Sequence, residues 1–118
     1  MIARIDAEWH GEVPVATLHG ELDASNVGEL GARLRALLSN QLIAMVVDLS
    51  GTTYLDSAGI NLLFALGEEM RGRQQRLALV VAEGSPIARM IALTGLDQAF
   101  AVRPSLSEAL SATSGDGA

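Results

Sequence analysis

Residues 46–60 read VVDLSGTTYLDSAGI, and this stretch decides the expected fold. Its first residues belong to a short apolar run, residues 43–49, whose composition is typical of a strand buried in the middle of a sheet. After a polar loop, Asp56 and Ser57 offer side-chain oxygens that can cap a helix, and apolar residues then recur at helical spacing. The stretch therefore predicts a core strand, a connecting loop and a helix over about residues 57–71.

Two strands and a helix are expected upstream of this stretch. Apolar and charged residues alternate over residues 3–9, which predicts a half-buried strand with Trp9 on its core side. Residues 13–18 are apolar and partly β-branched and should pair with the first strand as a hairpin, with Pro14 marking a sheet edge or a bulge. Leucines then recur at helical spacing, which predicts a helix over about residues 25–39.

The downstream part continues the alternation of strands and helices. Residues 77–82 have the composition of another buried strand, and Ser85 followed by Pro86 opens a helix that Gly95 should end. Residues 100–102 form a brief last strand, and a short capped helix follows. Because strands that alternate with helices pair in parallel through right-handed crossovers, the predicted fold class is α/β. We expect a single domain with a mixed four- to five-stranded sheet, an N-terminal hairpin and about four packed helices.

Length and composition agree with one compact domain. The chain has 118 residues, of which 49% are hydrophobic and only 3% aromatic, so its core must be built mainly from aliphatic side chains. We expect the domain to span residues 1–112, and the small, polar residues 113–118 to form a flexible tail. No apolar run reaches the roughly 18 to 20 residues of a membrane span, and the start of the chain lacks a secretion signal, so we expect a cytoplasmic protein.

Charge and residue types exclude several classes of function. A net charge of −6 with eight scattered basic residues argues against direct binding of nucleic acid. The absence of cysteine removes thiolate catalysis, and His10 and His19 have no third ligand at metal spacing, so we expect no metal. The glycines form neither a phosphate-binding loop nor a dinucleotide fingerprint, and we expect no cofactor. Asp48 ends the core strand as a receiver-domain aspartate would, but the chain has no lysine, so Asp48 is expected only to organise its loop.

Ser57 is the residue of this sequence that is best placed to accept a chemical modification. A helix start presents unpaired backbone N–H groups and the positive end of the helix dipole, so a phosphoryl group on a hydroxyl there finds donors already in place. The alternative is that Asp56 or Ser57 is only an N-cap, which stabilises a helix by about 1 kcal/mol. The local pattern alone favours the cap.

Residues 56–60, DSAGI, resemble the Asp-Ser-Ser/Thr-Gly-Leu/Ile signature of STAS domains that antagonise anti-sigma factors. Residues 20–23, GELD, resemble the first loop of that family, and the order of expected strands and helices matches from about residue 3 to residue 112. The resemblance implies that Ser57 accepts the phosphate and that Asp23 lies near it and helps to recognise the partner or kinase. One position departs from the pattern, because Ala58 stands where many members have Ser or Thr, so one hydroxyl is missing.

The resemblance also implies a mechanism. The unphosphorylated chain would bind an anti-sigma factor with serine kinase activity and so release sigma factor. The kinase would phosphorylate Ser57 to end the binding, and a PP2C-type phosphatase would reverse the modification. The domain itself would catalyse nothing. The surface expected to bind the partner consists of Asp23, Tyr54, Asp56, Ser57, Ala58 and Gly59.

Two other functions stay open at this point. The first is a STAS scaffold or accessory module of a larger signalling or transport complex, in which the same surface makes contacts without a phosphoswitch. The second is a small enzyme with Asp56 as acid and Ser57 as nucleophile, which would need a base such as His19 brought close by the fold.

Overall fold

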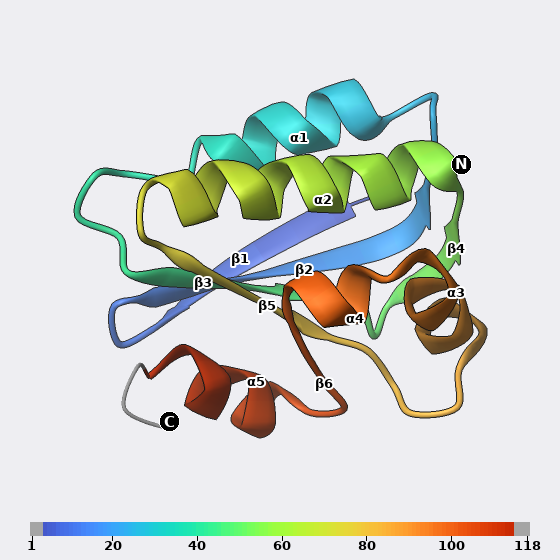
Figure 1. The fold of residues 1–118 in the computed structure, drawn as a ribbon. Helices are drawn as coiled ribbons and strands as arrows, with labels where there is room; N and C mark the ends of the chain where they lie inside the picture. Colours follow the sequence, from blue (N-terminus) through green and yellow to red (C-terminus); the bar gives the residue numbers. More distant parts are fainter. Residues whose placement is uncertain (1–3, 115–118) are drawn as a thin grey trace.

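The computed structural model describes residues 4–114 of the chain (Figure 1). Within this part there are six strands and five helices, and no helix is long and apolar enough to cross a membrane. In chain order the elements are β1 (Arg4–His10), β2 (Val13–Leu22), α1 (Val27–Arg35), β3 (Ala44–Asp48), β4 (Thr52–Leu55), α2 (Ser57–Gly72), β5 (Arg76–Val80), α3 (Pro86–Thr94), α4 (Leu96–Ala99), β6 (Ala101–Arg103) and α5 (Leu106–Thr113).

The strands form one mixed sheet. Its main path runs β1-β2-β3-β5-β6, and β4 pairs with β2 beyond the part of β2 that pairs with β3. β1 and β2 form an antiparallel hairpin, whereas the other neighbouring strands are parallel. Helices α1 and α2 lie on one face of the sheet and α5 lies on the other (Figure 1). This confirms the predicted α/β domain with its hairpin, and the described residues hold one strand, β4, and one helix, α4, that were not predicted.

The central strands are buried on both faces, because successive side chains of a strand point to opposite sides of a sheet. In β3, Met45 and Val47 pack in the larger core cluster with leucines of α1 and α2. Val46, between them, packs in a smaller cluster with Ala109 of α5. The apolar run that predicted a core strand therefore packs against helices on both faces of the sheet.

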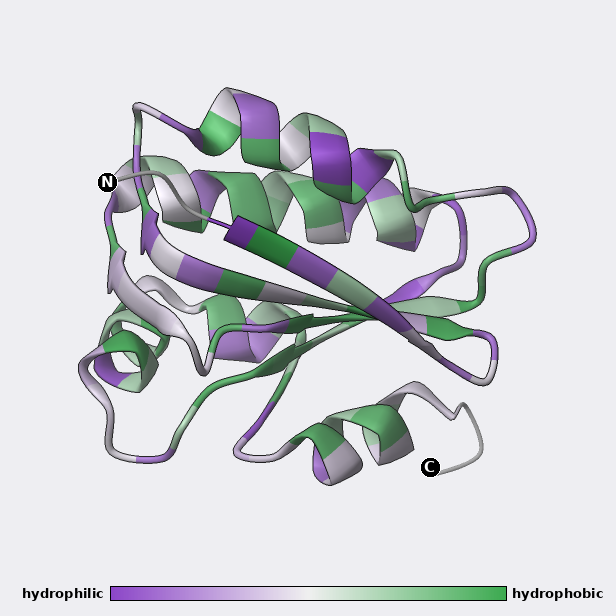
Figure 2. Cartoon of the chain, turned by 180° about the vertical axis from the view of Figure 1, so that it is seen from behind, coloured by the Kyte–Doolittle hydropathy of each residue, from purple (hydrophilic) through white to green (hydrophobic). Residues whose placement is uncertain are grey.

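The first strand is less buried than its alternation predicted. β1 lies at the edge of the sheet, and Ile5 is its one buried residue although hydrophobic and hydrophilic residues alternate along it (Figure 2). Trp9 was expected in the core, but 58% of its surface is exposed, so that prediction is wrong. Alternation tells which residues share a face, and it does not tell how far the core extends along that face.

The second strand is longer and more central than predicted. It pairs with β1 on one side, and with β3 and then β4 on the other. Pro14 pairs with β1 alone, and it lies directly before residues 15–17, which also pair with β3, so only this first stretch of β2 has a free side. The irregularity in register lies instead between Gly20 and Glu21, and Gly20 has φ of +96°, a conformation that glycine adopts without strain. This irregularity lies within the pairing of β2 with β4, directly after its first pair, Gly20 with Thr52.

Two helix ends also differ from the prediction. Helix α1 ends at Arg35, where bonds of 3₁₀ type such as Leu37 N–H to the Leu34 carbonyl replace the α-helical pattern. Helix α5 extends to Thr113, which is buried, so it takes in the first residue of the predicted tail. Residues 115–118 of that tail lie outside the described residues.

Helix α2 is packed tightly against the C-terminal part of the chain. The rings of Phe64 and Phe100 meet edge to face with centroids 6.2 Å apart, and the Arg71 guanidinium lies 4.9 Å from the centroid of the Phe100 ring. Gly67 lies where any Cβ would overlap the Phe100 ring. These contacts hold the C-terminal half of α2, and a rigid helix held at one end fixes the direction in which its first residue, Ser57, is presented.

Candidate functional site

The junction of β4 and α2 places Ser57 at the start of a long helix. Asp56 is the N-cap with an extended backbone (φ −102°, ψ −172°), and its Oδ1 accepts a hydrogen bond of 3.1 Å from Gly59 N–H. Ser57 is the first helical residue, and it is exposed. The hydroxyl therefore stands in solvent at the positive end of the helix dipole, where an added phosphate would be favoured by nearby N–H groups. The capping role expected for Asp56 is confirmed.

Asp56 also joins the start of α2 to the loop that follows β2. Its second carboxylate oxygen, Oδ2, accepts a hydrogen bond of 3.3 Å from Ala24 N–H, and its own N–H donates to the Leu22 carbonyl at 3.3 Å. The loop of residues 23–26, called the first loop from here on, thus lies directly beside Ser57. Asp23 belongs to this loop, and its part in recognition stays a prediction.

The first loop is ordered by its own short side chains. Asp23 Oδ1 accepts hydrogen bonds from the hydroxyl of Ser25 at 2.5 Å and from Ser25 N–H at 3.0 Å. Asn26 Oδ1 accepts from Asp23 N–H at 3.1 Å, and its Nδ2 donates to the Glu21 carbonyl at 2.8 Å. These roles of Ser25 and Asn26 were not predicted, although Asp-x-Ser and Asn in a loop are known signals of side-chain turns.

These hydrogen bonds lower the pKa of Asp23. The Ser25 hydroxyl is the largest cause and Ser25 N–H the second, because both donate to the ionised carboxylate. We expect Ser25→Ala to raise the pKa of Asp23 towards its ordinary value, since the larger cause is removed. A ¹³C NMR titration of the carboxyl carbon measures this, and Ser50→Ala, which leaves the first loop untouched, is the control. An unchanged pKa of Asp23 in Ser25→Ala would contradict the assignment.

Gly59 is required by close packing at the same junction. A Cβ on this residue would lie 2.8 Å from the carbonyl oxygen of Leu22 and 2.5 Å from Cδ1 of Leu55. Since one of these atoms belongs to the backbone of β2, it cannot simply move aside. The glycine of the DSAGI stretch therefore lets α2 begin directly against the end of β2.

The comparisons with known proteins agree with this arrangement. A family model described as "Mlab, STAS domain" matches residues 5–108. The chain belongs to the STAS domain family. Anti-sigma-F factor antagonist RsfB of Mycobacterium tuberculosis is 33% identical to this STAS domain over 106 residues, which cover 90% of the chain and 85% of the relative.

Solved structures share the fold over nearly the whole STAS domain. An anti-sigma factor antagonist from Mycobacterium paratuberculosis is 30% identical, with a TM-score of 0.85, over 95% of this chain and 94% of its own. The phosphorylated form of the Bacillus cell fate determinant SpoIIAA is 21% identical, with a TM-score of 0.65, over 91% and 96% of the two chains. The second likeness is one of fold.

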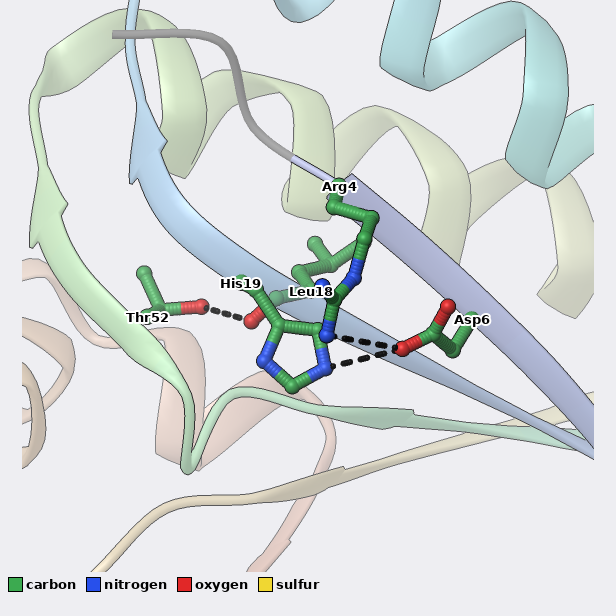
Figure 3. Close-up of polar contacts among 5 residues, drawn as sticks. All are labelled: Arg4, Asp6, Leu18, His19 and Thr52. Atoms are coloured by element: carbon green, nitrogen blue, oxygen red, sulfur yellow. Dashed lines mark hydrogen bonds and ion pairs between the residues drawn. The ribbon is translucent and has the colours of Figure 1, made fainter.

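The fold of the STAS domain does not bring His19 to Ser57 as a base. His19 Nε2 lies 3.2 Å from Oδ2 of Asp6, and a guanidinium nitrogen of Arg4 lies 3.3 Å from the same oxygen (Figure 3). The ring of His19 lies against Gly51, where a Cβ would come within 2.6 Å of Nδ1. Within residues 4–114 no hydrogen bond joins His19 to Ser57, so the geometry gives the enzyme alternative no support.

Asp48, Tyr54 and Ala58 lie in the consecutive elements β3, β4 and α2. Asp48 Oδ1 accepts a hydrogen bond of 2.9 Å from Ser50 N–H, which is the loop-organising role expected of it. Tyr54 lies in β4 with 49% of its surface exposed, close in sequence to Ser57. Ala58 is half-buried in the first turn of α2. The residues predicted to bind the partner thus belong to two segments that the bond from Ala24 to Asp56 joins, the β4–α2 junction and the first loop.

Proposed function

We propose that this STAS domain is an anti-sigma factor antagonist that binds a cognate anti-sigma factor while Ser57 is unmodified and releases it when Ser57 carries phosphate. The observation that carries the proposal is the exposed hydroxyl of Ser57 at the start of α2, joined through Asp56 to the first loop. The names of the relatives at 33% and 30% identity support the partner class.

The domain contributes an acceptor and a surface to this reaction. The Ser57 oxygen attacks the γ-phosphorus of ATP held by the partner, the bond to the β–γ bridging oxygen breaks, and ADP leaves. The proton of the hydroxyl passes to a base of the kinase, so the STAS domain needs none of its own. A PP2C-type phosphatase would return the hydroxyl by transferring the phosphoryl group to water. Exposure of Ser57 is what both partner enzymes require.

Phosphate would act on the interface through charge. It adds about −1.5 to −2 charges to a residue whose neighbour, Asp56, is already a carboxylate in contact with the first loop. A partner that has packed against Asp23 and Asp56 would have to remove water from the new charge as well. Release of the partner therefore follows from repulsion and desolvation, and it requires no change of fold.

The proposal is tested by incubating the chain with ATP and purified candidate anti-sigma factor kinases, followed by intact-mass and peptide analysis. We expect one phosphate, on Ser57, and none in Ser57→Ala. The matched control is Ser107→Ala, which removes an exposed hydroxyl of α5 on the opposite face of the sheet and should leave phosphorylation intact. Binding without any phosphorylation would favour a STAS scaffold or accessory module whose Asp56 and Ser57 only begin a helix.

A further inference from the structure

We propose that the end of the STAS domain opposite Ser57 binds reversibly to a lipid membrane with an anionic surface. The inference goes beyond the proposed function, because it concerns other residues and another kind of partner. This surface is called the far end from here on, and it consists of three exposed arginines and two exposed apolar residues: Arg33, Arg73, Arg76, Trp9 and Ile43.

The far end is built from segments that lie apart in the sequence. Figure 1 shows the C-terminal ends of α1 and α2, the turn between β1 and β2 and the start of β5 together, away from the start of α2. Arg76 N–H donates to the Ile43 carbonyl at 3.0 Å, and Trp9 is the last residue but one of β1, beside the hairpin turn. Because α2 has 16 residues and rises about 1.5 Å per residue, Arg73 lies about 24 Å along the helix from Ser57. A molecule bound at the far end therefore leaves the start of α2 free.

Positive charge gathers at the far end of an otherwise acidic chain. Two of the eight basic residues lie in the last turn of α1, and three more lie in residues 71–76. Arg35 and Arg71 are paired with glutamates of α2. Among the described residues no ion pair forms at Arg33, Arg73 or Arg76, and all three are exposed. These three guanidinium groups are thus available to the phosphate groups of lipids.

The opposing charges limit the strength of this attraction. The hairpin contributes Glu8 and Glu12, which are both exposed. The carboxylates of the first loop lie at the other end of α2, much further away than the Debye length of about 8 Å, so salt screens their repulsion. One arginine near an anionic leaflet strengthens binding about fivefold, which corresponds to about 1 kcal/mol. The binding should therefore be weak, reversible and sensitive to salt.

Two apolar side chains favour a lipid surface over a folded protein as the partner. Trp9 and Ile43 each have more than half of their surface exposed. The amphipathic ring of tryptophan suits the headgroup region of a bilayer, and isoleucine gains free energy when it leaves water. The cavity beside the end of α2 is lined by Arg76 but by neither Trp9 nor Ile43. Apolar side chains that stand in solvent beside basic ones fit a membrane, whose surface adapts to their shape.

Sedimentation with sucrose-loaded vesicles tests the inference on the whole chain without any protein partner. We expect the wild-type chain to sediment with vesicles of equal parts phosphatidylcholine and phosphatidylglycerol, and to stay in solution with phosphatidylcholine alone. Arg73→Glu should lower the partition constant by about tenfold or more, because it removes a positive charge and adds a negative one. The matched control is Arg89→Glu, which reverses an exposed arginine of α3, away from the far end, and should change the constant less than about twofold.

A second pair of variants tests the apolar contribution. Ile43→Ser should lower the partition constant about fivefold, because the exposed half of the side chain no longer gains from leaving water. The matched control is Leu93→Ser, which removes an exposed aliphatic residue of α3 and should change the constant less than about twofold. Circular dichroism checks that each variant keeps the fold.

Each other outcome overturns the inference in a distinct way. No sedimentation of the wild-type chain with the anionic vesicles rejects it and leaves the proposed function standing, since no anti-sigma factor takes part in the assay. Equal losses in Arg73→Glu and Arg89→Glu reject the far end as the binding site. Binding of soluble polyglutamate that Arg73→Glu abolishes, without sedimentation on vesicles, assigns the far end to an acidic protein segment. A wild-type dimer in analytical ultracentrifugation that becomes monomeric in Ile43→Ser, again without vesicle binding, assigns it to a second copy of this chain.

Discussion

Phosphate on Ser57 is expected to lower the affinity for the anti-sigma factor by at least tenfold, which corresponds to about 1.4 kcal/mol. The reason is the addition of about −1.5 to −2 charges beside Asp56, at a surface from which partner binding would remove water. Phosphoserine incorporated at position 57 during translation supplies the modified protein without a kinase. Calorimetric titration then compares it with Ser57→Ala, which should bind constitutively, and with Ser57→Asp, which should bind poorly.

The control for this experiment is a charge of the same sign elsewhere on α2. Ala65 is exposed and lies about two turns beyond Ser57, so Ala65→Asp adds a carboxylate to the same helix away from its start. We expect little change in affinity for this variant. Equal binding by Ser57→Ala and the phosphorylated chain would reject the electrostatic switch, whatever the kinase assay shows.

Gly59→Ala is expected to destabilise the domain by about 2 to 4 kcal/mol. The new Cβ would meet the Leu22 carbonyl and Leu55, and any shift of the helix start would also weaken the bond from Gly59 N–H to Asp56. Urea denaturation followed by far-ultraviolet circular dichroism measures the free energy of unfolding.

At a second glycine, replacement by alanine is expected to raise the stability of the domain instead of lowering it. Gly28 lies in α1, and an added Cβ there would meet nothing within 4 Å. Gly28→Ala should therefore stabilise the domain by about 0.5 to 1 kcal/mol, because alanine is the better helix former. A Gly59→Ala protein as stable as the wild type would show that the junction of β2 and α2 can relax, and that this close contact is not required.

The sequence predicted those elements whose signals are local and strong. The apolar run at β3, the Asp56 cap and the Ser85-Pro86 start with Gly95 at the end of α3 all appear as expected. Gly95 has φ of +81°, the left-handed conformation that ends helices. In each case a few neighbouring residues determine the structure, so no knowledge of distant contacts was needed.

The errors arose where distant contacts decide. β4 reads as a polar loop, and it is a strand because residues 52–55 pair with the bent end of β2, which no local pattern shows. Trp9 fits the core side of an alternating strand, but Ile5 is the one residue of β1 that is buried in the core. At the site, the resemblance placed Asp23 near Ser57, whereas the bond from Ala24 to Asp56 joins residues 32 positions apart and could not be read from spacing.

The exposed position of Trp9 has a practical consequence for spectroscopy. It is the only tryptophan of the chain, and its indole ring is largely in water already in the native state. Its emission should therefore change little when the domain unfolds. It also pairs with Pro14 on β2, roughly 25 Å along that strand from Leu22 at about 3.3 Å per residue. Tryptophan fluorescence would thus be insensitive to events at Ser57, and a fluorophore placed near the start of α2 would follow partner binding in real time.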